Sequence, residues 1–458
     1  MMMPMLWVVL SVLPAAEPLS AGVASVDITP PVGYRMSGYF YERPSTGVRD
    51  PLQAKCLVLS QGGQRAAVVF CDLIGVSREV ADAAREAAGR RTGIPPAHVA
   101  VAGTHTHSGP LYFGPLHAHF HRLAVQAHGR DPTQTVDYPA LLTERIVESI
   151  VRAKANLRPV LLSAGSAEVA PTPAFNRRYL LKDGSVRSLV SPLDPNVVRP
   201  VGPIDPRLDM LFICEADGAA PIALLSSFAL HAAVTGGTAY SADYPGHLEK
   251  TLRGAFGPGF VSLFGAGCCG DVNHVDVSRQ EQRTAEQIGT QLGETARQAI
   301  GRLDPVRGPR LAVRQERVEL ALQQYSPQEM AKAEKDMAAI GGKDLPFLEQ
   351  VKASKLTALR LLGRSTLTVD VQAVRISDDV AIVTLPGEIF VELGLAIKKA
   401  SPFKTTFVIE LANAGIHYVP TRRAFAEGGY ETVNCIIEPG GGEKLVEAAI
   451  RLLEELGG

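Results

Sequence analysis

The sequence has few cysteines and almost no excess charge, and both features exclude common classes of protein. Six cysteines occur in 458 residues and no Cys-x-x-Cys pair is present, so the cysteines do not predict a disulfide scaffold. The 46 basic residues are balanced by 47 acidic ones, which gives no electrostatic attraction to nucleic acid or to anionic lipid. Because the chain also has no internal repeat and no long linker, a single composite domain is the most economical organisation.

Long apolar runs are also lacking, and the N-terminal one is short. Residues 5–13 are apolar and are followed by small residues at Ala15, Ala16 and Ala21, which predicts a cleavable export signal over residues 1–21. This run is too short to span a bilayer, and no later stretch is long and apolar enough for a transmembrane helix. Because no Lys or Arg precedes the run, an apolar leader without that role is the alternative. We expect an exported protein, periplasmic or secreted, whose domain covers residues 22–458.

The most informative stretch is Gly-Thr-His-Thr-His-Ser-Gly-Pro at residues 103–110. It follows an apolar run at 99–102 that predicts a short buried strand. Residues two apart in an extended chain face the same side, so His105 and His107 project together. They lie where α/β proteins bind ligands, at the end of a strand, and a pair of imidazoles there indicates a site for zinc, iron or copper. Alone, the pair is equally compatible with one surface and one core histidine.

Four other predicted strands end in a residue that can take part in metal or acid–base chemistry. These residues are His231 after 222–230, Asp271 after 260–264, Glu388 after 380–384, and Tyr418 after 407–411. Each is individually typical of a turn. Together with the histidine pair they favour one site built from five strand ends.

The sequence resembles the catalytic domain of the neutral/alkaline non-lysosomal ceramidases from about residue 22 nearly to its end. Several landmarks occur in the order that this family uses. They are the Gly-Val-x-x-x-Asp-Ile-Thr-Pro-Pro segment at 22–31, the histidine box at 103–110, Asn-Arg at 176–177, Ile-Asp-Pro at 204–206, His231, Asp243, Gly-Asp-Val at 270–272, Pro-Gly-Glu at 386–388, and Tyr418 with Tyr430 twelve residues later. The resemblance implies an α/β fold of two stacked mixed β-sheets flanked by helices.

The resemblance also implies a ligand set for Zn²⁺, namely His105, His231, Glu388 and Tyr418. Two imidazoles, a carboxylate and a weak phenol ligand leave room for a water, as catalytic zinc requires. Zinc lowers the pKa of that water and polarises a bound carbonyl, so an amide can be attacked near neutral pH. His107 is then not a ligand, because it resembles the family's histidine that stabilises the oxyanion and transfers protons.

Four further residues match positions of the family around the metal. Arg177 and Tyr430 match residues that line the substrate cavity. Asp243 and Asp271 are expected to orient the metal-binding histidines, because a ligating imidazole needs an acceptor for its second nitrogen.

The chain departs from the family pattern in two places. The family's Gly-Asp-Val-Ser-Pro-Asn reads Gly-Asp-Val-Asn-His-Val at 270–275, so Asn273 replaces the serine implicated in catalysis. An amide can donate a hydrogen bond but cannot act as a nucleophile, which favours attack by a metal-bound water. Family members also carry a further β-sandwich domain, and we expect none after the final predicted helix at 443–456. Ceramide itself is therefore one candidate substrate among related N-acyl amides.

The sequence also contains a helical segment and a second group of histidines. Residues 326–363 begin with the capping box Ser-Pro-Gln-Glu and predict a pair of helices broken at 341–342. Their Lys- and Glu-rich composition favours a solvated helical insertion over a lid on the site. His117, His119 and His121 form a second cluster, which we interpret as a loop or helix start at the pocket mouth rather than as a metal site.

These observations lead to three functional hypotheses. The first is a zinc amidohydrolase that acts on ceramide or a related N-acyl lipid. The second is a zinc hydrolase of another bond, such as an ester, a lactone or a sugar-derived amide. The third is an exported, non-catalytic protein that binds lipid or carbohydrate, which is disfavoured because binding alone would not need the full ligand set. In each case the partner is a small molecule or lipid and not nucleic acid, and the sequence does not define an oligomeric state.

Overall fold

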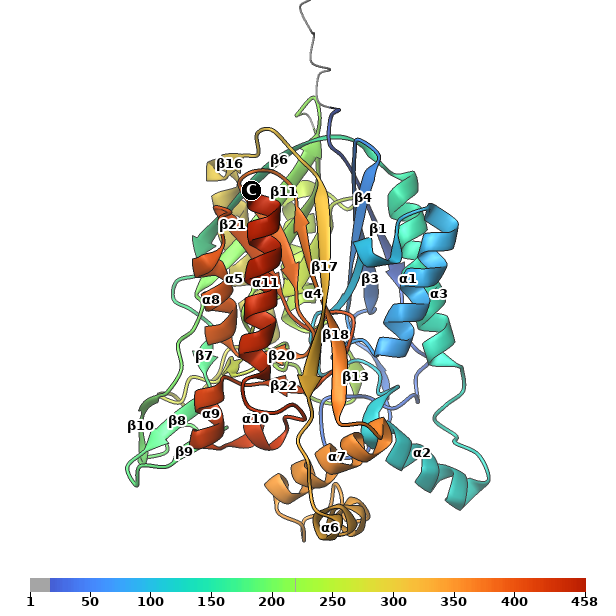
Figure 1. The fold of residues 1–458 in the computed structure, drawn as a ribbon, viewed down its shortest axis with the longest axis vertical. Helices are drawn as coiled ribbons and strands as arrows, with labels where there is room; N and C mark the ends of the chain where they lie inside the picture. The colour runs from blue at the N-terminus through green and yellow to red at the C-terminus, as the bar shows by residue number, and fades with distance from the viewer. Residues whose placement is uncertain (1–16, 219) are drawn as a thin grey trace, which may run out of the picture.

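The computed structural model describes residues 17–218 and 220–458. In this part of the chain two mixed β-sheets form the centre of the molecule (Figure 1). The larger sheet has the strand order β14-β12-β11-β6-β1-β3-β4-β5, with β16 paired to β6, and the smaller has the order β17-β18-β19-β21. The predicted fold class, with two stacked mixed sheets flanked by helices, is confirmed.

The larger sheet consists of β1 (Ser20–Asp27), β3 (Gln53–Gln61), β4 (Gln64–Cys71), β5 (Val99–Gly103), β6 (Arg158–Glu168), β11 (Arg207–Glu215), β12 (Pro221–Phe228), β14 (Val261–Ala266) and β16 (Asp304–Pro305). The smaller sheet consists of β17 (Ala312–Ala321), β18 (Thr366–Arg375), β19 (Val380–Thr384) and β21 (Thr405–Ile409). Short strands pair outside these sheets: β2 (Gly47–Val48) with β13 (Ala239–Tyr240), β7 (Phe175–Asn176) with β15 (Val272–Asn273), β20 (Glu388–Ile389) with β22 (Tyr418–Val419), and β8 (Arg178–Leu181) with β9 (Val186–Ser188) and β10 (Val197–Pro200).

The helices are α1 (Arg78–Thr92), α2 (Gly114–His128), α3 (Tyr138–Ala155), α4 (Tyr244–Phe256), α5 (Ala285–Ala299), α6 (Pro327–Met337), α7 (Phe347–Leu362), α8 (Val391–Ala400), α9 (Arg422–Glu427), α10 (Tyr430–Val433) and α11 (Gly441–Gly457), with 3₁₀ turns at Pro96–His98 and Ile300–Arg302. Helix α5 begins after the N-cap Thr284, whose side chain and that of Gln287 form a capping box. None of the described helices is both long and apolar enough to cross a bilayer.

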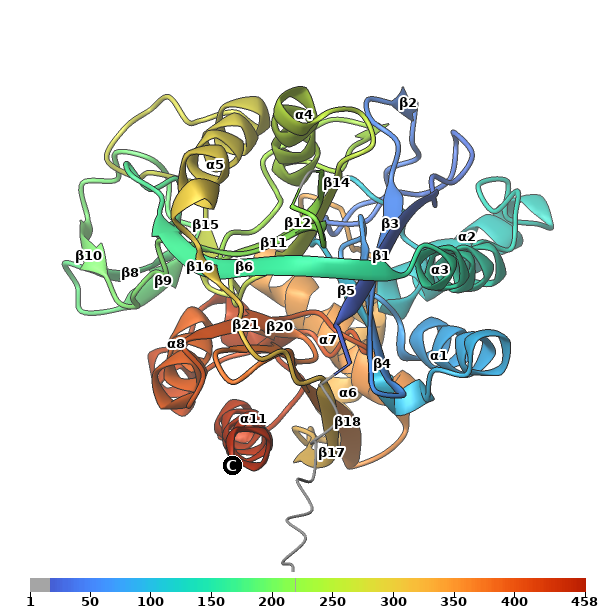
Figure 2. The same cartoon turned by 90° about the horizontal axis from the view of Figure 1, so that it is seen from above.

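A continuous apolar core joins the two sheets. It includes Leu57 and Leu211 of the larger sheet, and Ile382 and Phe407 of the smaller one, all almost fully buried. Helices cover the outer faces: α1 and α3 pack on one half of the larger sheet, α4 and α5 on the other half, and α8 and α11 on the smaller sheet. Figure 2 shows α4 and α5 on the side of the molecule opposite α11.

The loops that carry the predicted site leave strands that pair in parallel with a neighbour. The parallel pairs are β4 with β5, β12 with β14, and β19 with β21. Isolated bridges between Ala102 and Ala412 and between Gly267 and Ile409 tie the ends of these strands across the two sheets. Because parallel strands end at the same edge, the loops after β5, β12, β14, β19 and β21 meet there.

The N-terminal segment and the helical insertion were both predicted from the sequence. The apolar run at 5–13 lies outside the described residues, and the expected boundary at residue 21 falls inside β1, where Ser20 and Ala21 pair with β3. The insertion at 326–363 does form two helices with the expected capping box at Ser326. Its interpretation as a solvated decoration is wrong, because one face of α7 is buried and Ser354 lines the pocket described below.

Candidate metal centre

Four strand ends bring the predicted ligands together, as the sequence indicated. The Nε2 atoms of His105 and His231 each lie 3.3 Å from Oε2 of Glu388. The two imidazole rings are 4.3 Å apart between centroids and nearly perpendicular. Tyr418 joins the cluster with its hydroxyl 3.5 Å from Nε2 of His231.

These spacings fit a tetrahedral metal ion. Ligand atoms at bonds of about 2.0 to 2.1 Å from a tetrahedral zinc lie about 3.3 Å from one another, which matches the separations from Glu388. Within the described chain, Nε2 of His105 and Oε2 of Glu388 are buried without a hydrogen-bond partner. Leaving buried polar atoms unpaired is costly, and a shared cation satisfies both of them.

The ring orientations of the histidines also favour metal binding. Nδ1 of His105 donates to the carbonyl of Ile74 at 2.8 Å, and Nδ1 of His231 donates to the carbonyl of Cys269 at 2.7 Å. Since a carbonyl can only accept, the proton is on Nδ1 and each Nε2 keeps its lone pair. Both lone pairs therefore belong to the atoms that approach Glu388.

The expectation that Asp243 and Asp271 orient these histidines is not what the structure shows, because backbone carbonyls take that role. Asp243 caps α4, and its carboxylate accepts hydrogen bonds from the backbone N–H groups of Val234, Thr235 and Tyr244. Asp271 accepts from the side chain of Asn176 and from the backbone N–H of Val391. Both aspartates thus fix the loops around the cluster, and neither is bonded to a histidine ring.

The electrostatics of the cluster suit a cation. Burial lowers the pKa of His231 well below its ordinary value and that of His107 to about 3. Burial by itself would raise the pKa of Glu388, but the neighbouring His105 and His231 hold it well below its ordinary value. Burial thus favours the neutral form of His231, whose lone pair can bind a metal ion, and Glu388 supplies the negative charge of a divalent metal site.

Arg177 was expected to line the substrate cavity, but in the structure it holds Tyr418 in place. One of its guanidinium nitrogens donates to the Tyr418 hydroxyl at 3.0 Å and to the carbonyl of Gly270, while Nε donates to Glu431 at 2.8 Å. Glu431 is fully buried and also accepts a hydrogen bond from the guanidinium of Arg178. A guanidinium within hydrogen-bond reach of the phenol stabilises its charged form, although burial keeps the pKa of Tyr418 well above its ordinary value.

His107 lies between the cluster and an adjoining pocket. Its ligand atom lies within 4.8 Å of those of His105 and His231, and these three histidines form the group of potential metal ligands found among the described residues. Nδ1 of His107 donates to the carbonyl of Gly38 at 3.1 Å, whereas Nε2 is buried without a partner. The ring therefore offers an unprotonated nitrogen at the boundary between cluster and pocket.

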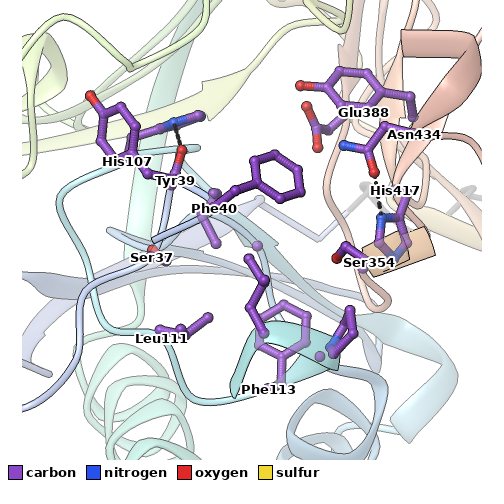
Figure 3. A pocket seen from close by; sticks show the side chains of 18 of the residues that line it. Ser37, Tyr39, Phe40, His107, Leu111, Phe113, Ser354, Glu388, His417 and Asn434 are labelled. Carbon is purple, nitrogen blue, oxygen red and sulfur yellow. Dashed lines mark hydrogen bonds between the residues drawn. The ribbon is translucent and has the colours of Figure 1, made fainter. Parts of the chain in front are cut away.

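The pocket has a volume of about 180 Å³ and a largely apolar lining. Figure 3 shows His107 and Tyr39 on one side, Glu388, Asn434 and His417 on the other, and Phe40 and Phe113 between them. Tyr430 lines it as expected from the resemblance. Of the described residues that were expected at the site, Glu388 and Tyr418 also line it, whereas His105, His231, Arg177, Asp243, Asp271 and Asn273 do not.

Asn273 lies on β15 and takes part in a local turn. Its side-chain oxygen accepts a hydrogen bond from the backbone N–H of Val275 at 3.1 Å. Its backbone pairs with Phe175 of β7, next to the pairing of Val272 with Asn176. The side chain thus stabilises the loop after β14.

Sequence reasoning missed several residues of this region. Tyr39 and Phe40 come from the loop after β1, which carries no motif for a site. Glu410 is fully buried directly behind the cluster, where it accepts hydrogen bonds from the N–H of Ile389 and the thiol of Cys269. His417 was also missed, and its position immediately before the expected ligand Tyr418 is the one signal that could have identified it.

The second histidine cluster is part of helix α2, as interpreted. His117 and His121 are four residues apart and stack with ring centroids 6.0 Å apart. His121 is bonded to the buried Asp131, which also pairs with Arg35. His119 points elsewhere and contacts Phe120, so the three rings do not converge, and Leu116 of the same helix lines the pocket mouth.

The fold and the cluster together define a protein of two stacked mixed sheets whose buried histidines could hold a metal ion. The family model described as neutral/alkaline non-lysosomal ceramidase, N-terminal, matches residues 19–279, more than half of the chain. The chain belongs to this family of hydrolases. No curated protein matches the chain in sequence.

Two solved structures share the fold. A neutral ceramidase from Pseudomonas aeruginosa has a TM-score of 0.73 and 22% identity, over 96% of this chain and 75% of that one. A structure described as ceramidase complexed with C2 has a TM-score of 0.71 and 20% identity, with the same coverage of both chains. At these identities the similarity establishes the fold.

Proposed function

We propose that this chain is a zinc-dependent amidohydrolase that cleaves an N-acyl amide, with ceramide or a related N-acyl lipid as substrate. The observation that carries the proposal is the convergence of His105, His231 and Glu388 at tetrahedral spacing, with two of their buried ligand atoms unpaired. Family membership supports a hydrolase. The neighbour complexed with C2 supports an amphiphilic substrate class.

Four residues would hold the zinc: His105 and His231 through Nε2, Glu388 through its carboxylate, and Tyr418 through its hydroxyl. Zinc at this position supplies Lewis acidity, which lowers the pKa of a water and polarises a carbonyl. The protein's own contribution is to fix the ligands. Arg177 fixes Tyr418, and the carbonyls of Ile74 and Cys269 fix the two imidazoles.

His107 is positioned to move the proton, because its Nε2 is buried without a partner at the boundary between cluster and pocket. Because its Nδ1–H is held by Gly38, Nε2 begins as an acceptor and takes the proton that water loses on attacking the carbonyl carbon. Once protonated, Nε2 donates to the developing oxyanion and then to the leaving amine. Water and amide are thereby converted to carboxylic acid and amine without a residue acting as nucleophile, which is consistent with Asn273 at the family's serine position.

The apolar pocket beside His107 supports an acyl or alkyl chain in the substrate. Phe40, Ile74, Leu111, Phe113 and Leu116 contribute to its wall. Since a cavity of about 150 Å³ holds one benzene, a volume of about 180 Å³ accommodates roughly seven carbons. A short segment of an acyl chain fits this volume better than a complete long chain does.

Metal content and activity of a His105→Ala variant test the proposal. The wild type should contain about one zinc per chain and hydrolyse members of a panel of ceramides, N-acyl amino acids and p-nitrophenyl esters. The variant should lose both zinc and hydrolysis, whereas His128→Ala at the exposed end of α2 should lose neither. Full hydrolysis by metal-stripped wild type would refute the proposal, and turnover of esters alone would move the chain to the second hypothesis.

Export is proposed as well, on the apolar run at 5–13 and the small residues that follow it. Expression of the full chain with analysis of its N-terminus tests this. Removal of the apolar run from protein found outside the cytoplasm is the expected result, and an intact N-terminus on cytoplasmic protein would contradict it.

A further inference from the structure

His417 and Asn434 form a polar pair in the pocket wall that the mechanism above does not use. Both residues line the pocket, and their side chains point toward each other on the side that carries Glu388 (Figure 3). Nδ1 of His417 lies 3.3 Å from Oδ1 of Asn434. Around them the wall is largely apolar, with Leu411, Ile416 and Phe113.

The hydrogen bonds of Asn434 determine which ring nitrogen of His417 carries the proton and which can accept a hydrogen bond. Nδ2 of Asn434 donates to the hydroxyl of Tyr430 at 3.2 Å, which directs Oδ1 toward His417. Because an amide oxygen only accepts, the His417 proton is on Nδ1. Nε2 then carries a lone pair, and no hydrogen bond within the described residues engages it.

The backbone of His417 is strained, and the turn itself does not require an imidazole. Its φ is 61°, in the left-handed region that non-glycine residues rarely adopt. The conformation is held by the bond from the N–H of Glu388 to the His417 carbonyl at 2.9 Å and by a bridge to Cys435. Glycine would satisfy the same backbone bonds without strain, so the side chain needs a separate explanation.

We propose that His417 is a specificity residue whose Nε2 accepts a hydrogen bond from a hydroxyl or N–H group of the substrate. The substrate class is then an N-acyl amide with a second hydrogen-bond donor, and not a plain alkyl amide. This inference rests on the proposed amidohydrolase function, since it assigns a second contact to the substrate of that site. A ligand that lacks this donor leaves the lone pair of His417 Nε2 unpaired. The pocket therefore discriminates against such a ligand.

Binding of non-hydrolysable ligand pairs to the zinc-loaded protein tests the proposal. Each pair consists of ketone analogues of an N-acyl amide that differ by one hydroxyl, placed on the acyl side in one pair and on the amine side in the other. Calorimetry should show that the wild type binds the hydroxylated member of at least one pair about 10-fold more tightly, the size of one hydrogen bond. A His417→Gly variant should bind both members of that pair equally.

Two further variants make the result decisive. Asn also tolerates a positive φ but is too short to replace the imidazole, so His417→Asn should lose the preference as His417→Gly does. Leu111→Ala, at an apolar position of the same pocket, should weaken both members together and keep their ratio. The proposal is overturned if the wild type shows no preference in either pair, or if the two His417 variants keep it.

Failure of this inference can be told apart from failure of the proposed function. Hydrolysis of the corresponding amides is measured separately on the same wild-type preparation. Loss of the binding preference with amide hydrolysis intact refutes the role of His417 alone. A binding preference without any amide hydrolysis refutes the proposed reaction and leaves the polar contact standing.

Discussion

The metal cluster and the rim of the pocket are neighbours, yet they are held in place by different interactions. Backbone carbonyls and buried loops after parallel strands fix His105 and His231. The rim consists of Phe40 and Tyr430, which line the pocket, and of Phe347 of α7, which packs against both. It depends on ring contacts between residues far apart in sequence, because Phe347 lies 5.7 Å from Phe40 and 5.6 Å from Tyr430 between centroids. We therefore expect the cluster to be rigid and suited to one chemistry, and the rim to adjust to the substrate.

The largest effect should follow from removing the one charged group of the cluster. Glu388→Gln keeps the shape of the side chain but leaves the metal with uncharged ligands, so we expect zinc content and hydrolysis to fall to background. Elemental analysis of purified protein and an amide-hydrolysis assay measure both. Glu392→Gln, four residues later and paired with Arg423 at the surface, should keep both. A Glu388→Gln protein with one zinc per chain would refute the assignment of Glu388.

A smaller effect should follow from removing the residue at the boundary of the two regions. His107→Ala should lower kcat by about 10²- to 10³-fold, the effect of losing one oxyanion donor. Zinc should stay bound, because the proposed ligand set does not include His107. Steady-state kinetics and zinc content measure the two quantities together. If His107→Ala loses its zinc, His107 is a ligand and the boundary between cluster and pocket has to be redrawn.

The supports of the cluster should have a weaker effect than its ligands. Glu410 links the two ligand loops, because it accepts from the N–H of Ile389 at 2.5 Å and from the thiol of Cys269 at 3.0 Å. The carbonyl of Cys269 in turn holds His231. Glu410→Gln replaces one acceptor oxygen with a donor, and we expect a 10- to 100-fold loss of zinc affinity, typical of residues that orient metal ligands.

Chelator competition measures the zinc affinity of the Glu410 variant. Glu443→Gln is its matched control, since Glu443 also accepts a backbone N–H, that of Arg422, away from the cluster. Equal zinc affinity in the Glu410→Gln variant and the wild type would show that the ligand loops are held by their backbone alone.

The way in which the cluster is built explains why its ligands could be predicted from the sequence. His105, His231, Glu388 and Tyr418 each follow an apolar run, and such a run identifies both a strand and its end. Because parallel strands end at a common edge, the convergence of these residues follows from local pattern. The acceptors of the histidine Nδ1 atoms are carbonyls of Ile74, Cys269 and Gly38. Every residue has a carbonyl, so no side-chain pattern marks these positions, and Asp243 and Asp271 were chosen in their place.

The rim was harder to predict because its contacts are tertiary and its buried face is partly polar. Helix α7 buries Gln350, Ser354 and Lys355 along with apolar residues, so its composition resembles that of a solvated helix. Gln350 is bonded to Gly341 and Lys355 to Tyr325. Because these partners lie outside α7, the composition of the helix alone does not indicate that its polar residues are buried.

The smallest effect should come from the rim. Phe347 is 47% exposed, and each of its ring contacts stabilises by only about 0.5 to 1.5 kcal/mol. Phe347→Ala should therefore lower the free energy of unfolding by about 1 kcal/mol. It should raise KM for amides with a chain in the pocket by roughly threefold to tenfold while kcat stays close to the wild-type value, because Phe40 and Tyr430, which line the pocket, lose the ring that packs against both, and their contacts serve ground state and transition state alike.

Leu348→Ala is the matched control for this change. Leu348 is the next residue of α7 and is 44% exposed, but it cannot take part in the ring contacts that join Phe40 to Tyr430. It should leave KM unaltered, and thermal unfolding together with a KM-against-kcat comparison separates the two variants. A Phe347→Ala protein in which kcat falls while KM is unchanged would show that the rim stabilises the transition state. The division between a rigid cluster and an adjustable rim would then fail, because both regions would serve the chemical step.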